Sequence, residues 1–149
     1  MQRFARVPRL RGSIAGLGAA FGVAFAVPPL LAAEGQLTIE LNKLEDTEEG
    51  CRSLFVVDNE TGHELHRFRL DLILFDPEGV YAKQLLLDLA PLYEDKKVVA
   101  SFLLAEDPCA SLGSILINDV PWCENGAGAT IDCVKQLEVR SRSDVPLEK

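Results

Sequence analysis

Apolar and polar residues alternate with a period of two along much of this chain, and that alternation limits the fold more than any other feature. Between Leu37 and Asn42 every second residue is apolar, and the same holds between Arg67 and Leu74. Successive side chains of a strand point to opposite faces, so each segment predicts a strand with one buried face. The stretch "CRSLFVVDN", residues 51–59, is denser in β-branched and aromatic residues and predicts a more buried strand.

Turn signals separate these segments. "DPEG" at 76–79 places a proline, a glycine and an aspartate where a tight turn needs them, and "NETG" at 59–62 is a second such corner. The sequence therefore predicts an all-β fold of about seven strands, an antiparallel sandwich or barrel. A short helical turn is expected near residues 108–112, a glycine-rich loop at "ENGAGATID", and a last edge strand at "CVKQLEV".

The first 33 residues have the order of parts of a secretory signal peptide. A basic, acid-free start is followed by a small apolar stretch from Ile14 to Val27, and Ala33 supplies a small residue for cleavage. An uncleaved anchor is the alternative, although the apolar stretch is shorter than the roughly 20 residues of a membrane span. We expect residues 34–149 to form a single β-sandwich domain with a loose C-terminal tail, "RSRSDVPLEK".

The exported part is strongly acidic. Residues 34–149 hold 23 acidic and 11 basic residues, so their net charge is −12. This charge repels phosphate backbones and anionic lipid, and argues against nucleic-acid binding and against stable membrane insertion after signal cleavage.

Four cysteines, Cys51, Cys109, Cys123 and Cys133, all lie in the exported part. An even number in a small exported domain is typical of disulfides, and the spacings do not fit a zinc site. If each strand reverses the one before it, Cys51 and Cys109 lie at one end of the sandwich and Cys123 and Cys133 at the other. Strand direction therefore predicts the pairs Cys51–Cys109 and Cys123–Cys133, because bridged Cα atoms lie within about 7 Å. Disulfides also predict a periplasmic or secreted location.

No catalytic constellation is visible in the sequence. His63 and His66 are the only histidines, and their spacing of three puts them on opposite faces of a strand. The acidic pairs lie in turns, where acids favour solubility. We expect no enzyme activity and no cofactor. Binding of a small ligand or metal ion by His63, His66 and neighbouring acids is an alternative hypothesis.

Two expected loops carry large apolar side chains. One holds Pro91, Leu92 and Tyr93, and the other holds Pro121 and Trp122. These residues are candidate contacts for a protein partner, and the competing interpretation is that they close the ends of the sandwich. The sequence thus favours a disulfide-stapled, non-enzymatic envelope module that binds another envelope protein. The two expected modes are addition of a partner strand to an open sheet edge and contact through a surface patch.

The segments "FVVDN", "LDLILFDPEGV", "LAPL", "KK" and "SF" resemble the Phe-x-Leu-Tyr-Asp class of small immunoglobulin-like bacterial domains. The exported part as a whole resembles a family of short exported proteobacterial proteins that are named for a twin-arginine translocation signal. "LTIELNKLE", "GCR", "SILINDV" and two cysteines with nine residues between them carry this likeness. The resemblance implies export and an all-β, antiparallel immunoglobulin-like β-sandwich of about seven strands, and it implies no activity. The chain departs from the family in having no adjacent pair of arginines.

Overall fold

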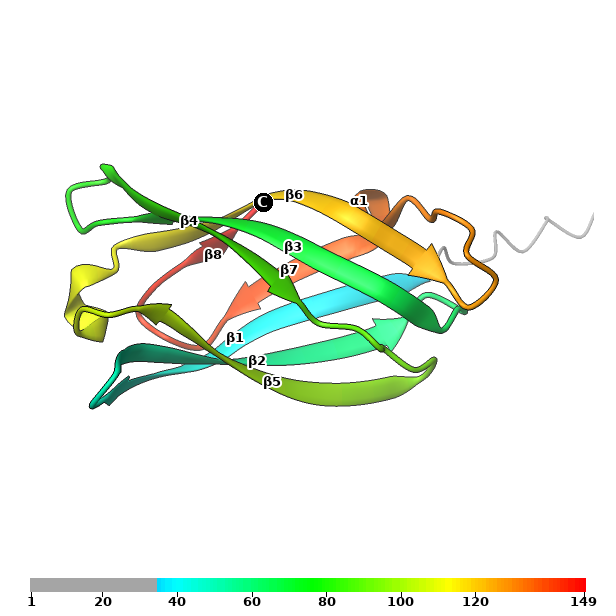
Figure 1. Cartoon of the computed structure of the whole chain (residues 1–149), viewed down its shortest axis with the longest axis horizontal. Coiled ribbons are helices and arrows are strands. Elements are labelled where there is room, and N and C mark those ends of the chain that lie inside the picture. The colour runs from blue at the N-terminus through cyan, green and yellow to red at the C-terminus, as the bar shows by residue number, and fades with distance from the viewer. Residues whose placement is uncertain (1–34) are drawn as a thin grey trace, which may run out of the picture. The chain divides into compact units, whose positions relative to one another are not determined.

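The computed structural model describes residues 35–149, so the expected signal peptide lies outside the described residues. These residues form an all-β sandwich of two four-stranded sheets (Figure 1). The strands are β1 (Gln36–Thr47), β2 (Gly50–Glu60), β3 (Leu65–Phe75), β4 (Tyr81–Asp88), β5 (Lys96–Ala105), β6 (Ser114–Asn125), β7 (Leu137–Ser141) and β8 (Leu147–Glu148). The helical elements are η1 (Cys109–Ser111) and α1 (Cys133–Gln136). Within the described part of the chain no helix is long and apolar enough to span a membrane.

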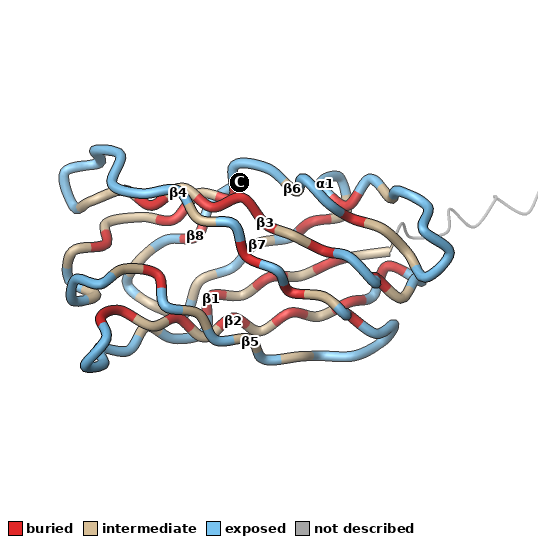
Figure 2. Tube along the Cα trace, viewed as in Figure 1, coloured by how far each residue is buried: buried red, intermediate tan, exposed pale blue. Residues whose placement is uncertain are grey.

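The alternating segments form the centre of each sheet. The first sheet has the order β5-β2-β1-β7 and the second the order β4-β3-β6-β8. Leu37, Ile39 and Leu41 on β1 face the interior and are fully buried, as is Phe55 on β2. Figure 2 shows this alternation of buried and less buried residues along β1, β2 and β3. The interior face of each central strand thus supplies the core, as the period of two predicts.

The corner at 76–79 has the predicted chemistry. Gly79 has a φ of 78°, its N–H donates to the carbonyl of Asp76, and the Asp76 side chain accepts a hydrogen bond from the Val80 N–H at 2.8 Å. These contacts reverse the chain between β3 and β4. The short helical turn is also present as η1.

Both disulfides pair as strand direction predicts. Cys51 at the start of β2 is bonded to Cys109 in η1, and Cys123 in β6 is bonded to Cys133 in α1. Residues 35–149 contain no free cysteine. Two disulfides are typical of proteins in a non-reducing, extracytoplasmic environment.

Two strand pairings differ from the predicted antiparallel arrangement. β7 runs parallel to β1, and β8 runs parallel to β6. The cause is the segment after β6, where "CVKQLEV" is not one strand. Its first four residues form α1, and the chain then turns into β7 at the edge of the first sheet.

The glycine-rich segment "ENGAGATID" is held by Asn125. The Asn125 side-chain oxygen accepts hydrogen bonds from the N–H groups of Ala127 and Ala129, and the N–H of Ile131 donates to the carbonyl of Cys123. This segment is therefore an ordered turn that returns along the end of β6.

The expected loose tail is instead packed against both sheets. The Arg142 N–H donates to the carbonyl of Leu41, and Pro146 accepts a hydrogen bond from the N–H of Ile115. Leu147 in β8 is 7% exposed. The short run Val145, Pro146 and Leu147 gives no periodic signal, and its contacts with residues distant in the sequence hold the tail.

Candidate functional site

Strand β4 has a free edge. It pairs with β3 on one side, and no strand among residues 35–149 pairs with its other side. β5 is likewise the edge of the first sheet, and β4 and β5 lie on the same side of the sandwich, toward the viewer in Figure 1. A free edge presents unpaired N–H and C=O groups that can pair with another chain.

The register identifies the backbone groups that β4 leaves free. The N–H of Leu89 donates to the carbonyl of Phe68 at 3.0 Å. Hydrogen-bonded and non-hydrogen-bonded pairs alternate along an antiparallel ladder. Leu85 and Leu87 therefore form the bonded pairs with β3, and the N–H and C=O groups of Gln84 and Leu86 point outward.

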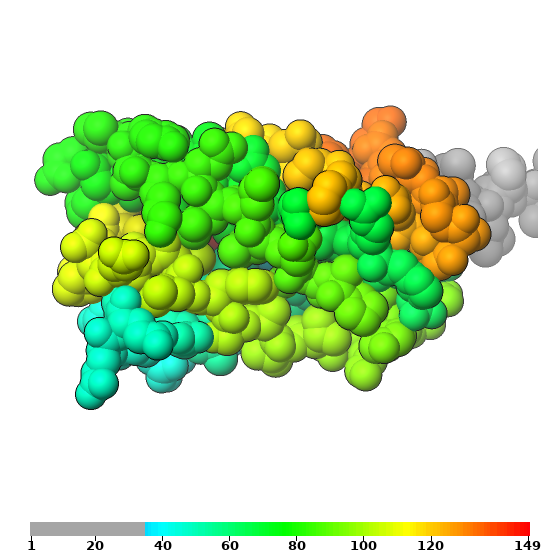
Figure 3. Space-filling model, viewed as in Figure 1, coloured from blue at the N-terminus to red at the C-terminus, as the bar shows by residue number. Residues whose placement is uncertain are grey.

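Most of the exposed large apolar side chains belong to the segment that runs from just before β4 to the end of β5. Six of the eight large apolar residues that are exposed within 35–149 lie between Val80 and Leu103. They are Val80, Tyr81, Leu86, Tyr93, Val99 and Leu103. The surface view shows residues of β4 and β5 across the middle of the face toward the viewer (Figure 3). Leu86, at 57% exposure, projects from the outer face of β4 next to the free backbone groups.

A hollow of about 410 Å³ lies between the start of β4 and the end of β5. Its lining includes Ala82 and Lys83 of β4 and Ala105 of β5, with Leu74 and Leu112 as apolar walls. Three acids complete it: Asp76, Glu106 and Asp107. None of these three acids forms an ion pair with another residue of the described part of the chain.

The predicted loop with Pro121 and Trp122 is part of strand β6, which corrects the sequence interpretation. Trp122 is 37% exposed, and the guanidinium carbons of Arg67 and Arg69 lie 4.0 and 3.8 Å from its ring centroid. Both arginines belong to β3, where they alternate with the buried Phe68 and Leu70. They therefore lie on the outer face of the second sheet. Trp122 therefore lies on a strand and makes cation–π contacts with two arginines; it does not lie in a loop.

The loop with Pro91, Leu92 and Tyr93 is divided between core and surface. Leu92 is 1% exposed and exchanges backbone hydrogen bonds with Leu65, so it belongs to the core. Pro91 is exposed, and Tyr93 is 45% exposed with the Lys96 ammonium 5.0 Å from its ring centroid. Of the three candidates, Leu92 closes the end of the sandwich, whereas Pro91 and Tyr93 stay accessible.

His63 and His66 do not form a joint site with acids. His63 is exposed in the turn before β3, and His66 lies on β3 with its Nε2 atom 3.1 Å from a carboxylate oxygen of Glu64. Within residues 35–149 no group of three or more histidine, cysteine, aspartate or glutamate side chains is placed to hold a metal ion.

A second hollow, of about 520 Å³, lies where the C-terminal tail leaves the first sheet. Leu44, Leu112 and Val145 form apolar walls. The charged lining residues are Lys43, Arg142 and Asp144, and the two cations form ion pairs with Glu45 and Glu40, respectively. It is separate from both histidines.

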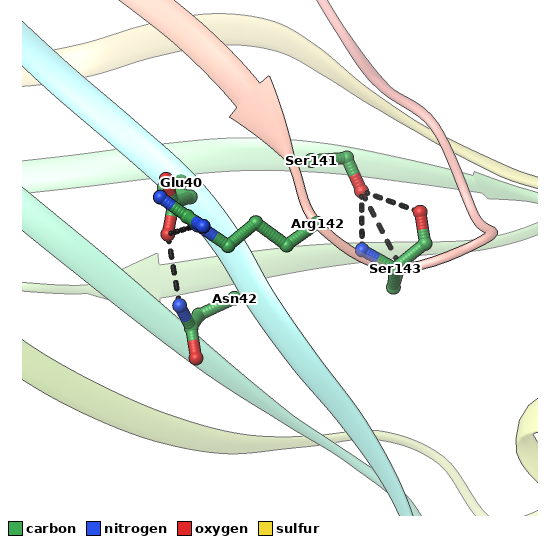
Figure 4. A network of polar contacts seen from close by, with 5 residues as sticks. All are labelled: Glu40, Asn42, Ser141, Arg142 and Ser143. Atoms are coloured by element: carbon green, nitrogen blue, oxygen red, sulfur yellow. Dashed lines mark hydrogen bonds and ion pairs between the residues drawn. The ribbon is translucent and has the colours of Figure 1, made fainter.

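The tail beside this hollow is fixed by polar contacts (Figure 4). The Ser141 hydroxyl donates to the carbonyl of Val145 at 2.6 Å. Glu40 accepts hydrogen bonds at 2.8 Å from the Asn42 amide and at 2.8 Å from Arg142 Nε. These two contacts, that of Asn42 first, lower the pKa of Glu40. Arg142 is thus tied to β1 through a carboxylate that stays ionised.

Sequence reasoning expected an open sheet edge but did not identify β4 as the strand that has it. The signal available was the run "LLL" at residues 85–87, which interrupts the period of two. Three successive leucines on a strand cannot all face the core, so one must face solvent. The alternation alone does not reveal that this strand is at an edge.

Comparison of the chain with protein-family models, with curated proteins and with solved structures finds no match. The site therefore has to be interpreted from its own geometry.

Proposed function

We propose that this chain is an exported, disulfide-stapled, non-enzymatic module of the cell envelope that binds a protein partner by adding a partner strand to β4. The observation that carries the proposal is the free edge of β4, where Leu86 is 57% exposed beside outward-pointing backbone groups. In strand addition, backbone hydrogen bonds supply affinity and neighbouring side chains supply specificity.

The location is part of the proposal. The basic and apolar first 33 residues support export, and the two disulfides support an oxidising compartment, for which we propose the periplasm.

Natural edge strands are usually protected against unwanted pairing by charge, proline or a cover. The centre of β4, from Gln84 to Leu87, carries no charge and no proline. Lys83 and Asp88 flank this uncharged centre. An uncharged edge of this kind is suited to a partner strand.

The experiment compares wild type with Leu86→Lys. The exported chain is used to capture partners from an envelope extract, and Val134→Lys, at an exposed valine of α1, is the matched control. We expect the wild type and the control to retain the same partner and Leu86→Lys to lose it.

Amide hydrogen exchange on the complex gives a second readout. The amides of Gln84 and Leu86 should be protected in the complex and unprotected in the free chain. A partner that binds Leu86→Lys as well as wild type, with unchanged exchange in β4, would refute strand addition.

The hollow beside the C-terminal tail favours a second candidate function, binding of a small ligand. Its volume of about 520 Å³ lies within the range of small-molecule sites, and it combines apolar walls with Lys43 and Arg142. A thermal-shift screen of small carboxylic acids tests this. A ligand of this site should raise the melting temperature of wild type but not of Ala110→Trp, which fills the hollow.

A further inference from the structure

We propose that the segment recognised by β4 is basic and places a lysine or arginine side chain in the hollow between β4 and β5. This inference rests on the proposed function, because it assigns a chemistry to the strand that β4 would bind. The inference adds two points to the proposed function: the hollow acts as a specificity pocket, and the partner segment is basic.

The position of the hollow links it to the free edge. Ala82 and Lys83 of β4 line it, and Ala105 contributes from β5 across the gap between the sheets. A strand added to β4 would lie on the same side of the sandwich, and every second side chain of it would point inward toward β5. A side chain opposite the start of β4 therefore meets the hollow.

The acidic lining of the hollow favours a positively charged side chain from the partner strand. Three acids line it against one lysine, which gives a local charge of −2. The Asp76 carboxylate is already used by the N–H of Val80, whereas Glu106 and Asp107 have no ion-pair partner in the described part of the chain. A lysine or arginine side chain of the partner could form ion pairs with Glu106 and Asp107.

The walls of the hollow fit the shape of that side chain. Ala82 offers exposed apolar surface next to the acids, and the largely buried Leu74 and Leu112 form the floor of the hollow. Lysine and arginine carry a long apolar stem below a charged head, so the stem can pack on these walls while the head reaches the carboxylates.

The overall charge favours a foreign partner over a second copy. Residues 34–149 hold 23 acidic and 11 basic residues, so each exported copy carries a net charge of −12. Two copies joined through β4 would bring two acidic hollows to one interface, and like charges in an interface are unfavourable. A basic segment has the complementary charge, and the same field would attract it before contact.

The experiment selects displayed random twelve-residue peptides for binding to the exported chain. We expect the selected peptides to alternate apolar and polar residues and to be enriched in lysine or arginine at one fixed position. Labelled versions of these peptides are then titrated against four proteins: wild type, Leu86→Lys, a double variant Glu106→Gln with Asp107→Asn, and a control double variant Glu138→Gln with Asp144→Asn. The last two lose the same charge, but only the first pair lines the hollow.

The expected result is a dissociation constant about three- to tenfold higher for the Glu106/Asp107 variant, an unchanged value for the control, and no binding to Leu86→Lys. Peptides that bind at the Leu86 edge without basic enrichment would overturn this inference and leave the proposed function standing. Failure to select any peptide, or binding that ignores Leu86→Lys, would overturn both. Self-association of the chain that Leu86→Lys abolishes would identify a second copy as the occupant and would also overturn the inference.

Discussion

Arg69 on β3 holds Asp88 on β4 with two hydrogen bonds, from Nε to Oδ1 at 2.7 Å and from Nη2 to Oδ2 at 2.6 Å. Arg69 also stacks on Trp122, so one guanidinium joins the edge strand β4 to β6 across the second sheet. Its hydrogen bonds lower the pKa of Asp88 below the ordinary value of 3.8.

This pair gives a pH-dependent contribution to stability. Because the folded pKa lies below the unfolded one, the contribution is fully present above the unfolded value and is lost as the pH falls through the folded value. We predict that Asp88→Asn lowers the urea midpoint at pH 7, and that the difference from wild type closes as the pH falls below about 4. Asp144→Asn, which removes an acid that forms no ion pair within residues 35–149, should show no difference at either pH. A gap of equal size at pH 7 and pH 3 would contradict the assignment.

Leu92 should behave as a core residue although it lies in a connection between strands. It is 1% exposed, so Leu92→Ala is expected to destabilise the fold by about 2–5 kcal/mol in urea unfolding. The neighbouring Tyr93→Ala should change stability by much less, because Tyr93 is 45% exposed. Equal effects of the two substitutions would show that Leu92 is not an anchor of the core.

The Asn59 side chain forms hydrogen bonds to the connection between β2 and β3 and to the connection between β4 and β5. It is fully buried, and its Nδ2 atom lies 2.8 Å from the carbonyl oxygen of His63 and 3.0 Å from that of Leu92. Asn59→Ala removes this shared donor and also the oxygen that accepts a hydrogen bond from the buried Thr61 hydroxyl at 2.8 Å. We therefore predict a loss of about 1–3 kcal/mol in unfolding free energy. Asn42→Ala is the matched control, because Asn42 is exposed and bonds only to a surface carboxylate among the described residues. A cost for Asn59→Ala no larger than that of the control would rule out this role.

The two disulfides should differ in their effect on stability. Cys51 and Cys109 are 58 residues apart, and Cys123 and Cys133 are 10 apart. In the chain-entropy description, longer closed loops give more stabilisation, about 4 kcal/mol for the first bridge and about 3 kcal/mol for the second. We predict that the double variant Cys51→Ala with Cys109→Ala melts at a lower temperature than Cys123→Ala with Cys133→Ala. The reverse order in calorimetry would show that loop length does not govern the difference.

The central strands were predictable because a strand with one buried face has apolar residues at every second position of its sequence. β1, β2 and β3 each pack an inner row of side chains, and the period of two follows. The disulfide pairing was predictable for a related reason, since strand direction fixes which end of the sandwich each cysteine reaches.

The remaining features depend on residues distant in sequence. Leu92 and Trp122 occur in segments whose local pattern fits a loop, and only the packing of other strands decides that one is buried and the other lies on β6. β8 has two residues and is held by its partner β6. The free edge of β4 depends on the order of strands in the sheet, and alternation within one strand does not encode that order.

The parallel pairing of β7 with β1 determines when this domain can be completed. About a hundred residues separate the partners Leu37 and Leu137. A nascent chain therefore leaves β1 without a neighbour on one side until residues 137–141 have been synthesised and delivered. Folding governed by such distant contacts is slow compared with local structure formation. β1 therefore has β2 as its neighbour early, whereas its other edge is covered only when β7 is in place.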